Sequence, residues 1–171
     1  RTLLLSRKPD GRVFSMKISD ASGLKSKDFQ RYARRGLTEC MLGKGVIVVE
    51  GLTEFHALPV VARVMEENDP KLQPLDISGV VFFDAESESS MSKFGTFFKT
   101  LGLKTFSYYD FIIERKPEKK QQLIDSFDIN FEHPHKGFEA LIANEVQVDR
   151  LWKFLEDLRK SGDNGSFEIP I

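Results

Sequence analysis

The sequence over residues 45–55 reads Gly-Val-Ile-Val-Val-Glu-Gly-Leu-Thr-Glu-Phe, and it carries a strong signal for the class of fold. Its β-branched run from Val46 to Val49 shows no alternation of polar and apolar residues and is bounded by Gly45 and Gly51. Such a run is typical of a strand that is buried on both faces, as the strands of a parallel sheet are. We therefore expect a buried strand of a parallel sheet here, followed by a helix.

Strands and helices are predicted to alternate along the rest of the chain. Apolar runs predict strands over residues 77–83, 104–109 and 127–132, and helical spacing predicts helices over residues 53–67, 90–101, 118–126, 136–144 and 148–160. Because proline costs about 3 kcal/mol inside a helix, the first helix is expected to begin near Leu58 or to kink at Pro59. This order predicts an α/β fold with a mostly parallel central sheet flanked by helices.

The N-terminal part of the chain carries a different pattern. The turn sequence Pro9-Asp10-Gly11 separates two short apolar runs and predicts a β-hairpin within residues 1–18. A helix over residues 24–42, interrupted at Gly36, is expected to follow it. We expect a connecting unit of hairpin and helix over residues 1–44 and the main domain over residues 45–171. Since the chain begins without Met, we also expect it to be a piece of a longer protein.

Composition limits the classes of partner. The chain has 171 residues, with 25 Lys and Arg against 26 Asp and Glu, so its formal charge is -1. This balance excludes nucleic-acid binding through overall charge, and such a partner would need a local basic patch or a metal ion. The single cysteine, Cys40, excludes an internal disulfide and a cysteine zinc site and favours a cytoplasmic protein. No apolar run approaches the roughly 18 residues of a membrane span, so we expect no membrane partner.

Acidic residues stand where two of the predicted strands end. Glu50 closes the first strand, Glu54 follows about one helical turn later, and Asp110 comes directly after the strand over residues 104–109. Ligands bind beyond the carboxyl ends of strands in open parallel sheets, and carboxylates are the oxygen ligands that Mg²⁺ and Mn²⁺ prefer. The alternative is structural, because an acid such as Glu54 also favours a helix N-terminus and an acid such as Asp110 a turn.

Residues 45–55 resemble the opening motif of a Toprim domain, and more closely that of the OLD (overcoming lysogenization defect) family nucleases. The run over residues 35–44 precedes this motif as a connecting run does in that family. Residues 76–82 and Leu101-Gly102-Leu103 resemble the segments that follow it. The resemblance covers roughly residues 35–145, and it implies a small parallel α/β sheet with acidic metal ligands at the ends of its first and third strands.

The resemblance implies a metal-dependent endonuclease domain that hydrolyses phosphodiester bonds of DNA. The catalytic residues would be Glu50, Glu54 and Asp110. Together with Glu139, in a helix start that resembles a later acidic motif of the family, they would hold Mg²⁺ or Mn²⁺. In two-metal sites of this kind, one ion activates water and the other stabilises the leaving oxygen.

The chain departs from the family pattern at one acidic position. The family carries Asp-x-Asp at the end of the third strand, and here Ile112 stands at the second acidic position. Glu114 is either a substitute for that acid or the start of a charged loop. Asp84 is a further candidate ligand, or else belongs to a solvated loop, and Lys136 is a candidate for the catalytic lysine of the family.

The resemblance also implies partners. Residues 1–44 would form the junction to an N-terminal ATPase module of the same parent chain, which would act in phage defence or repair. Because the sequence has no Gly-x-x-x-x-Gly-Lys-[Ser/Thr] motif, ATP is expected only in that module. A homo-oligomer is a further expected assembly. The most basic cluster would steer DNA, or would simply form a solvated helix face; it comprises Lys25, Lys27, Arg31, Arg34 and Arg35.

A rival function belongs to another class. Loss of the acid at Ile112 would allow a degenerate Toprim domain that is weak in catalysis and serves as an interaction or assembly module. A zinc protein is a poorer alternative, because His133-Pro134-His135 supplies two histidines without the third nearby ligand that a zinc site would need.

Overall fold

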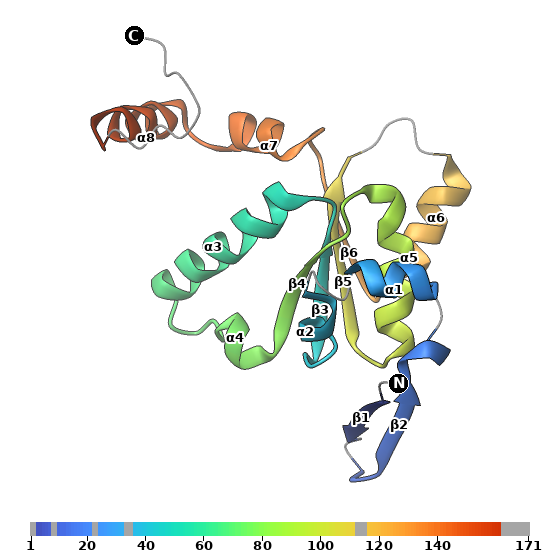
Figure 1. Ribbon diagram of the computed structural model, residues 1–171. Helices are drawn as coiled ribbons and strands as arrows, with labels where there is room; N and C mark the ends of the chain where they lie inside the picture. The colour runs from blue at the N-terminus through green and yellow to red at the C-terminus, as the bar shows by residue number, and fades with distance from the viewer. Residues whose placement is uncertain (1–2, 8–9, 22–23, 33–35, 112–115, 162–171) are drawn as a thin grey trace.

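A four-stranded, fully parallel sheet forms the centre of the molecule. The structure is a computed structural model that describes residues 3–7, 10–21, 24–32, 36–111 and 116–161 (Figure 1). The strand order is β4-β3-β5-β6, with all three pairings parallel. The strands are β3 (Gly45–Val49), β4 (Val80–Asp84), β5 (Lys104–Asp110) and β6 (Ile129–His133). The predicted α/β fold with a mostly parallel sheet is confirmed.

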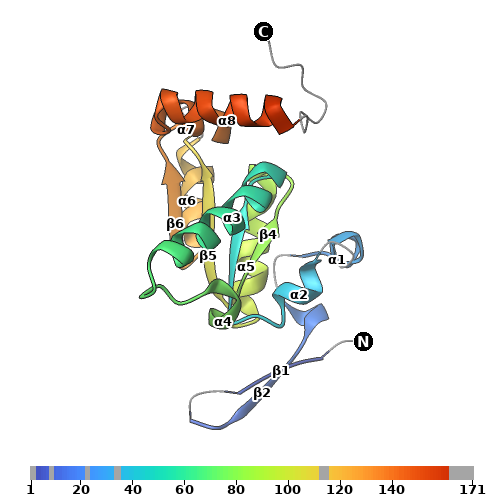
Figure 2. The same cartoon turned by 90° about the vertical axis from the view of Figure 1, so that its left-hand side faces the viewer.

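Helices cover both faces of this sheet. Figure 1 shows α3 (Leu52–Asn68) and α4 (Leu75–Ser78) on one side. On the other side lie α1 (Ser26–Tyr32), α5 (Glu88–Thr100) and α6 (Pro117–Asp125). Two further helices, α7 (Phe138–Glu145) and α8 (Val148–Ser161), extend beyond the edge at which the strands end (Figures 1 and 2). The carboxyl ends of the strands therefore face α7 and not the N-terminal hairpin.

Strand β3 is buried because it pairs with β4 on one side and β5 on the other. Val46, Val48 and Val49 are fully buried. A run of β-branched residues suits this position, since it fills both faces of the pleated sheet and leaves no polar side chain without a partner. The stretch that predicts the fold is thus its central strand.

A cluster of aromatic rings joins α5 to the sheet. The ring of Phe83 on β4 lies 4.6 Å from that of Phe94 on α5, and Phe94 in turn lies 4.7 Å from Tyr32 of α1. Phe97 and Phe98 of α5 are also buried. The helical spacing of these phenylalanines places them on one face of α5, so their burial accounts for the packing of that helix.

The N-terminal residues form the predicted hairpin and share the core of the sheet. Strands β1 (Leu3–Arg7) and β2 (Val13–Lys17) are antiparallel, and η1 (Ile18–Asp20) follows them. The helix expected over residues 24–42 is instead two helices, α1 and α2 (Thr38–Cys40). Gly36, between them, has φ +82°, a left-handed conformation that glycine adopts readily and that a helix does not contain.

Cys40 lies in this shared core. Its thiol is 3.7 Å from the Phe82 carbonyl oxygen of β4, and the residue is 1% exposed. Burial, with a smaller contribution from the Glu39 charge, raises the pKa of the Cys40 thiol to about 12. The residue acts here as a small apolar side chain.

One boundary prediction is wrong. The strand expected from Ile77 begins only at Val80, because residues 75–78 form α4, and Gly79 ends that helix with φ +73°. Helix α3 begins at Leu52, close to the predicted start at residue 53, and continues through Pro59, so the alternative start near Leu58 is excluded. The Phe55 N–H bonds the Gly51 carbonyl oxygen at 3.1 Å, so the first turn forms well before the proline. Over the described ranges, no helix combines the length and the apolar character needed to cross a bilayer.

Candidate metal centre

Polar side chains close all four parallel strands at one edge of the sheet. Glu50 follows β3 directly, Asp84 ends β4, Asp110 ends β5 and His133 ends β6. Val49 is in register with both Asp84 and Tyr108, so Asp110 lies one residue further along its strand than Glu50 does. The expectation that Glu50 and Asp110 follow adjacent parallel strands is confirmed, and this is the edge at which open parallel sheets bind ligands.

Glu54 points back to this edge from the first turn of α3. Although it is charged, only 7% of its surface is exposed. One of its carboxylate oxygens would lie 3.5 Å from a Cβ atom built at Gly51, which precedes the helix. The Glu-Gly-x-x-Glu spacing thus places one carboxylate at the strand end and the second one turn into the helix, on the same side of the connecting loop.

The carboxylates at this edge repel one another. Burial raises the pKa of Glu50, and the charges of Asp110, Glu88 and Glu54 raise it further. Burial likewise raises the pKa of Glu54, and the charges of Asp110 and Glu139 add to that rise although backbone hydrogen bonds oppose it. The negative charge is therefore concentrated where it is poorly solvated, an arrangement that a divalent cation would relieve.

A buried oxygen of Glu50 has no hydrogen-bond partner in the part of the chain that the structure describes, and this bears on whether these residues suit a cation. Among the residues described, Oε2 of Glu50 is the buried side-chain oxygen or nitrogen for which no hydrogen-bond partner is found. A buried carboxylate oxygen without a partner is costly unless a ligand satisfies it. Hard oxygen donors of this kind fit Mg²⁺ or Mn²⁺. Nevertheless, within the described residues no three Asp, Glu, His or Cys side chains already stand close enough together to hold an ion. Binding would therefore require these side chains to move together.

Asp110 is held by the neighbouring strand. Its Oδ1 lies 2.6 Å from Nε2 of His133, whose side chain is 6% exposed. Its Oδ2 lies 3.9 Å from the Cβ position at Gly137, and an oxygen of Glu139 lies 3.2 Å from that same position. Gly137 has φ +93° and precedes α7, so this glycine brings the first turn of α7, with Glu139, toward Asp110.

The other predicted ligands behave differently. Asp84 Oδ1 accepts a 2.7 Å hydrogen bond from the Glu86 N–H, so this carboxylate shapes the loop after β4. Lys136 is exposed between β6 and α7. Glu114 and Ile112 lie outside the described residues. The predicted ligands whose charges act on one another at this edge are thus Glu50, Glu54, Asp110 and Glu139.

Three residues near the carboxylates are not predicted from the sequence. Glu88 in the first turn of α5 contributes to the raised pKa of Glu50. Burial raises the pKa of Tyr108, and the charges of Glu54 and Asp110 add to that rise. His133 bonds Asp110 directly. Tyr108 could be found from the sequence, because it precedes Asp110 by two residues and shares its face of the strand. The places of Glu88 and His133 beside the carboxylates cannot be predicted without knowing which strands are neighbours.

The basic cluster is only partly free to meet DNA. Lys25 and Lys27 are exposed. Arg31 pairs with Glu86 at 2.8 Å. Arg34 and Arg35 lie outside the described residues. A hollow of about 1130 Å³ is lined by residues of α1 and of the loops after β3 and β4, among them Arg31, His56, Asp84 and Lys93.

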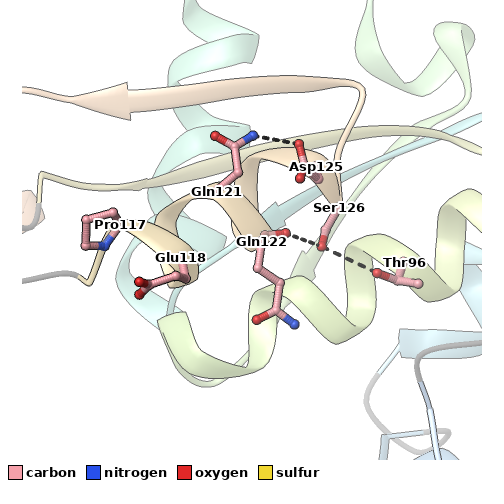
Figure 3. Close-up of a pocket in the computed structure, with 7 residues that line it drawn as sticks. All are labelled: Thr96, Pro117, Glu118, Gln121, Gln122, Asp125 and Ser126. Carbon is pink, nitrogen blue, oxygen red and sulfur yellow. Dashed lines mark hydrogen bonds between the residues drawn. The ribbon is translucent and has the colours of Figure 1, made fainter.

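A second hollow lies away from the carboxylates. It lies between α5 and α6 (Figure 3). Its volume is about 750 Å³. Gln121 Nε2 donates to Asp125 at 2.8 Å, and the Ser126 hydroxyl bonds the Gln122 carbonyl oxygen at 2.7 Å (Figure 3). These bonds join neighbouring turns of α6, and none of the carboxylates at the sheet edge lines this groove. It is therefore not part of the candidate metal centre.

Comparison with known families finds a match over the middle of the chain. Residues 41–111 match the model of the overcoming lysogenization defect protein-like TOPRIM domain. No curated protein matches the chain. The matched segment runs from the end of α2 through β3, β4 and β5, and it includes Glu50, Glu54 and Asp110. TOPRIM domains typically bind a divalent metal and are generally associated with nuclease or primase activity. Over residues 41–111 the chain is thus similar to the TOPRIM domain of overcoming lysogenization defect protein-like proteins.

Proposed function

We propose that this chain is a metal-dependent DNA endonuclease module that nicks or cleaves phosphodiester bonds with Mg²⁺ or Mn²⁺. The observation that carries this proposal is the unpartnered Oε2 of Glu50, buried among like-charged carboxylates at the ligand-binding edge of the sheet. The family of the domain supports a function connected with nucleic acids. Glu50, Glu54, Asp110 and Glu139 would hold the ion.

Each proposed ligand is held in place by a strand end or by the first turn of a helix. Glu50 and Asp110 are fixed by the ends of two paired strands, so the direction of each carboxylate is set by the sheet. Glu54 is held by the first turn of α3, and Glu139 by the first turn of α7. A bound divalent cation would supply the positive charge that stabilises charge building up on the phosphate. The exposed Lys25 and Lys27 would attract the DNA backbone.

The test is cleavage of supercoiled plasmid at low salt, with Mn²⁺ and without ATP. We expect slow nicking that EDTA abolishes, because the proposed ligands all belong to this chain whereas its charge of -1 attracts DNA weakly. Glu54→Ala should reduce nicking to the EDTA level. Glu67→Ala, which removes an exposed acid from the same helix, should leave the rate unchanged.

A second candidate function rests on an apolar surface. The groove between α3 and the sheet has a volume of about 400 Å³, and apolar and aromatic side chains line it. Three of them, Val61, Met65 and Phe131, are 48%, 55% and 53% exposed. Such a surface suits an interaction or assembly module. If wild type and Glu54→Ala are equally inert with excess Mn²⁺ while the domain self-associates, this function replaces the nuclease.

The setting of the module is part of the proposal. The chain would act in the cytoplasm beside an ATPase module of the same parent chain, joined through residues 1–44, and ATP would bind only there. Assembly as a homo-oligomer is the corresponding proposal for its quaternary structure. Sedimentation of the purified chain with and without Mn²⁺ would test that assembly directly.

A further inference from the structure

His133 lies where the neighbouring strands β5 and β6 end together. In the parallel register of β5 and β6, Asp110 and His133 are partners. The imidazole is 6% exposed, and its Nε2 lies 2.6 Å from Oδ1 of Asp110. A contact this short between a buried ring and a partly buried carboxylate is a strong hydrogen bond.

The second ring nitrogen decides which partner donates. The backbone N–H of His135 donates to Nδ1 of His133 over 3.3 Å. Because a nitrogen that accepts a hydrogen bond carries no proton, we assign the proton of the neutral ring to Nε2. His133 is then the donor and Asp110 the acceptor. With both nitrogens engaged, the ring has no lone pair left for a metal ion.

Contacts on both sides fix the ring and the carboxylate. The ring of Tyr108 lies 5.4 Å from that of His133, centroid to centroid. The Phe111 N–H, directly after Asp110, donates to the His135 carbonyl oxygen at 3.2 Å. The segment His133-Pro134-His135 is therefore bonded to residues 110–111 through a side chain and through the backbone.

We propose that His133 is the positioning residue for Asp110: it occupies Oδ1 and leaves Oδ2 directed toward a divalent cation. Oδ2 is the oxygen nearer to the Cβ position at Gly137, the residue that precedes α7. Hydrogen bonds to the outer oxygen of a ligating carboxylate orient it and change metal affinity by about 10- to 100-fold. This inference rests on the proposed metal-dependent function.

Calorimetric titration with Mn²⁺ in the absence of DNA tests the inference. His133→Phe keeps a planar ring but removes the donor, and we expect Mn²⁺ affinity to fall by about 10-fold or more. His133→Gln supplies an amide N–H near the position of Nε2 and should keep affinity within about 3-fold of wild type. His135→Gln is the matched control; its ring bonds Glu145 and not Asp110, so affinity should not change.

The outcomes separate this inference from the proposed function. If wild type binds Mn²⁺ and folded His133→Phe binds it equally well, the positioning role is wrong while the metal site stands. If wild type binds no Mn²⁺, both are wrong. Should His133→Phe not fold, imidazole ¹⁵N spectra of the wild type decide. We expect the His133 proton on Nε2, and a shift of that signal both on adding Mg²⁺ and in Asp110→Asn. A proton on Nδ1, or an Nε2 signal indifferent to both changes, would overturn the inference.

Discussion

Gly95 of α5 lies directly against the ring of Phe127. A Cβ atom at residue 95 would stand 2.6 Å from Cζ of Phe127 and 2.7 Å from the carbonyl oxygen of Ser126. Real side chains do not tolerate such distances, so only glycine allows α5 to approach the segment between α6 and β6 this closely. This contact holds the segment that leads into β6 against α5.

We predict that Gly95→Ala lowers the free energy of unfolding by about 1–3 kcal/mol, as overpacking of a core does. Helix propensity alone predicts the opposite, a gain of about 1 kcal/mol. Urea unfolding followed by circular dichroism measures the sign. Ser92→Ala in the same helix is the control and should change stability little. A higher free energy of unfolding in Gly95→Ala would show that α5 and the segment between α6 and β6 can move apart without loss of stability.

Stability without metal should depend on the acids of the candidate centre. The folded-state pKa values of Glu50 and Glu54 lie above their ordinary value of 4.5. Between the ordinary and the raised values the folded state binds more protons than the unfolded state. Unfolding free energy therefore falls as pH rises through that interval, and stays lower at neutral pH.

Glu50→Gln removes one of these charges and should raise the melting temperature at pH 7.5 by about 2–4 °C in EDTA. It should also remove most of the stabilisation that Mn²⁺ gives the wild type. Differential scanning fluorimetry with and without Mn²⁺ measures both effects. Glu67→Gln, at an exposed position of α3, should behave as wild type does. Equal responses to Mn²⁺ in wild type and Glu50→Gln would refute the assignment of Glu50 as a ligand.

DNA affinity should depend on the exposed lysines before α1 and in its first turn. Each phosphate contact contributes about -0.9 to the slope of log K against log salt. Replacing Lys25 and Lys27 together with Gln should reduce the magnitude of that slope by about 2. Fluorescence anisotropy with a labelled duplex at several salt concentrations gives the slope. Lys153→Gln, exposed on α8, serves as the control, and an unchanged slope in the double variant would place the DNA elsewhere.

A further prediction concerns Ile112, which lies outside the described residues. If the missing acid of the family motif limits catalysis, Ile112→Asp should raise the rate of Mn²⁺-dependent nicking. The added carboxylate would supply ligand charge for a second ion. In Ile112→Asn the side chain has nearly the shape of aspartate but no charge, so this variant should not raise the rate of nicking. Equal rates in wild type and folded Ile112→Asp would mean that this position does not limit cleavage.

The elements of the sheet could be predicted because their sequences carry strong local signals. Val46 to Val49 can form little but a buried strand, and Pro117 begins α6 as a proline at a first helical position does. The start of β4 could not be predicted in the same way. Ile77 and Ser78 suit a strand by composition, but Gly79 adopts a left-handed conformation that ends a helix there. Local propensity is a weak guide where one short element meets the next.

In the candidate metal centre, too, local sequence signals predict some residues, whereas other contacts depend on how the strands pair. Glu50, Glu54 and Asp110 could be proposed because each follows a recognisable strand or begins the helix after it. The contact between His133 and Asp110 could not, since it requires knowing that β6 pairs with β5 and in which register. Read along the chain, two histidines separated by one proline are only a weak signal for zinc ligation. In three dimensions one of them instead bonds the carboxylate of a neighbouring strand.

Because Cys40 is buried, the rate at which its thiol is labelled can measure how often the core opens. The thiolate is the form that reacts with alkylating reagents, and a thiol with a pKa near 12 that is 1% exposed is almost inert in the closed structure. Since the chain has one cysteine, any labelling reports the separation of α2 from β4. At low reagent concentration the labelling rate gives the equilibrium of that opening, and at saturation it gives the rate at which the N-terminal segment parts from the sheet.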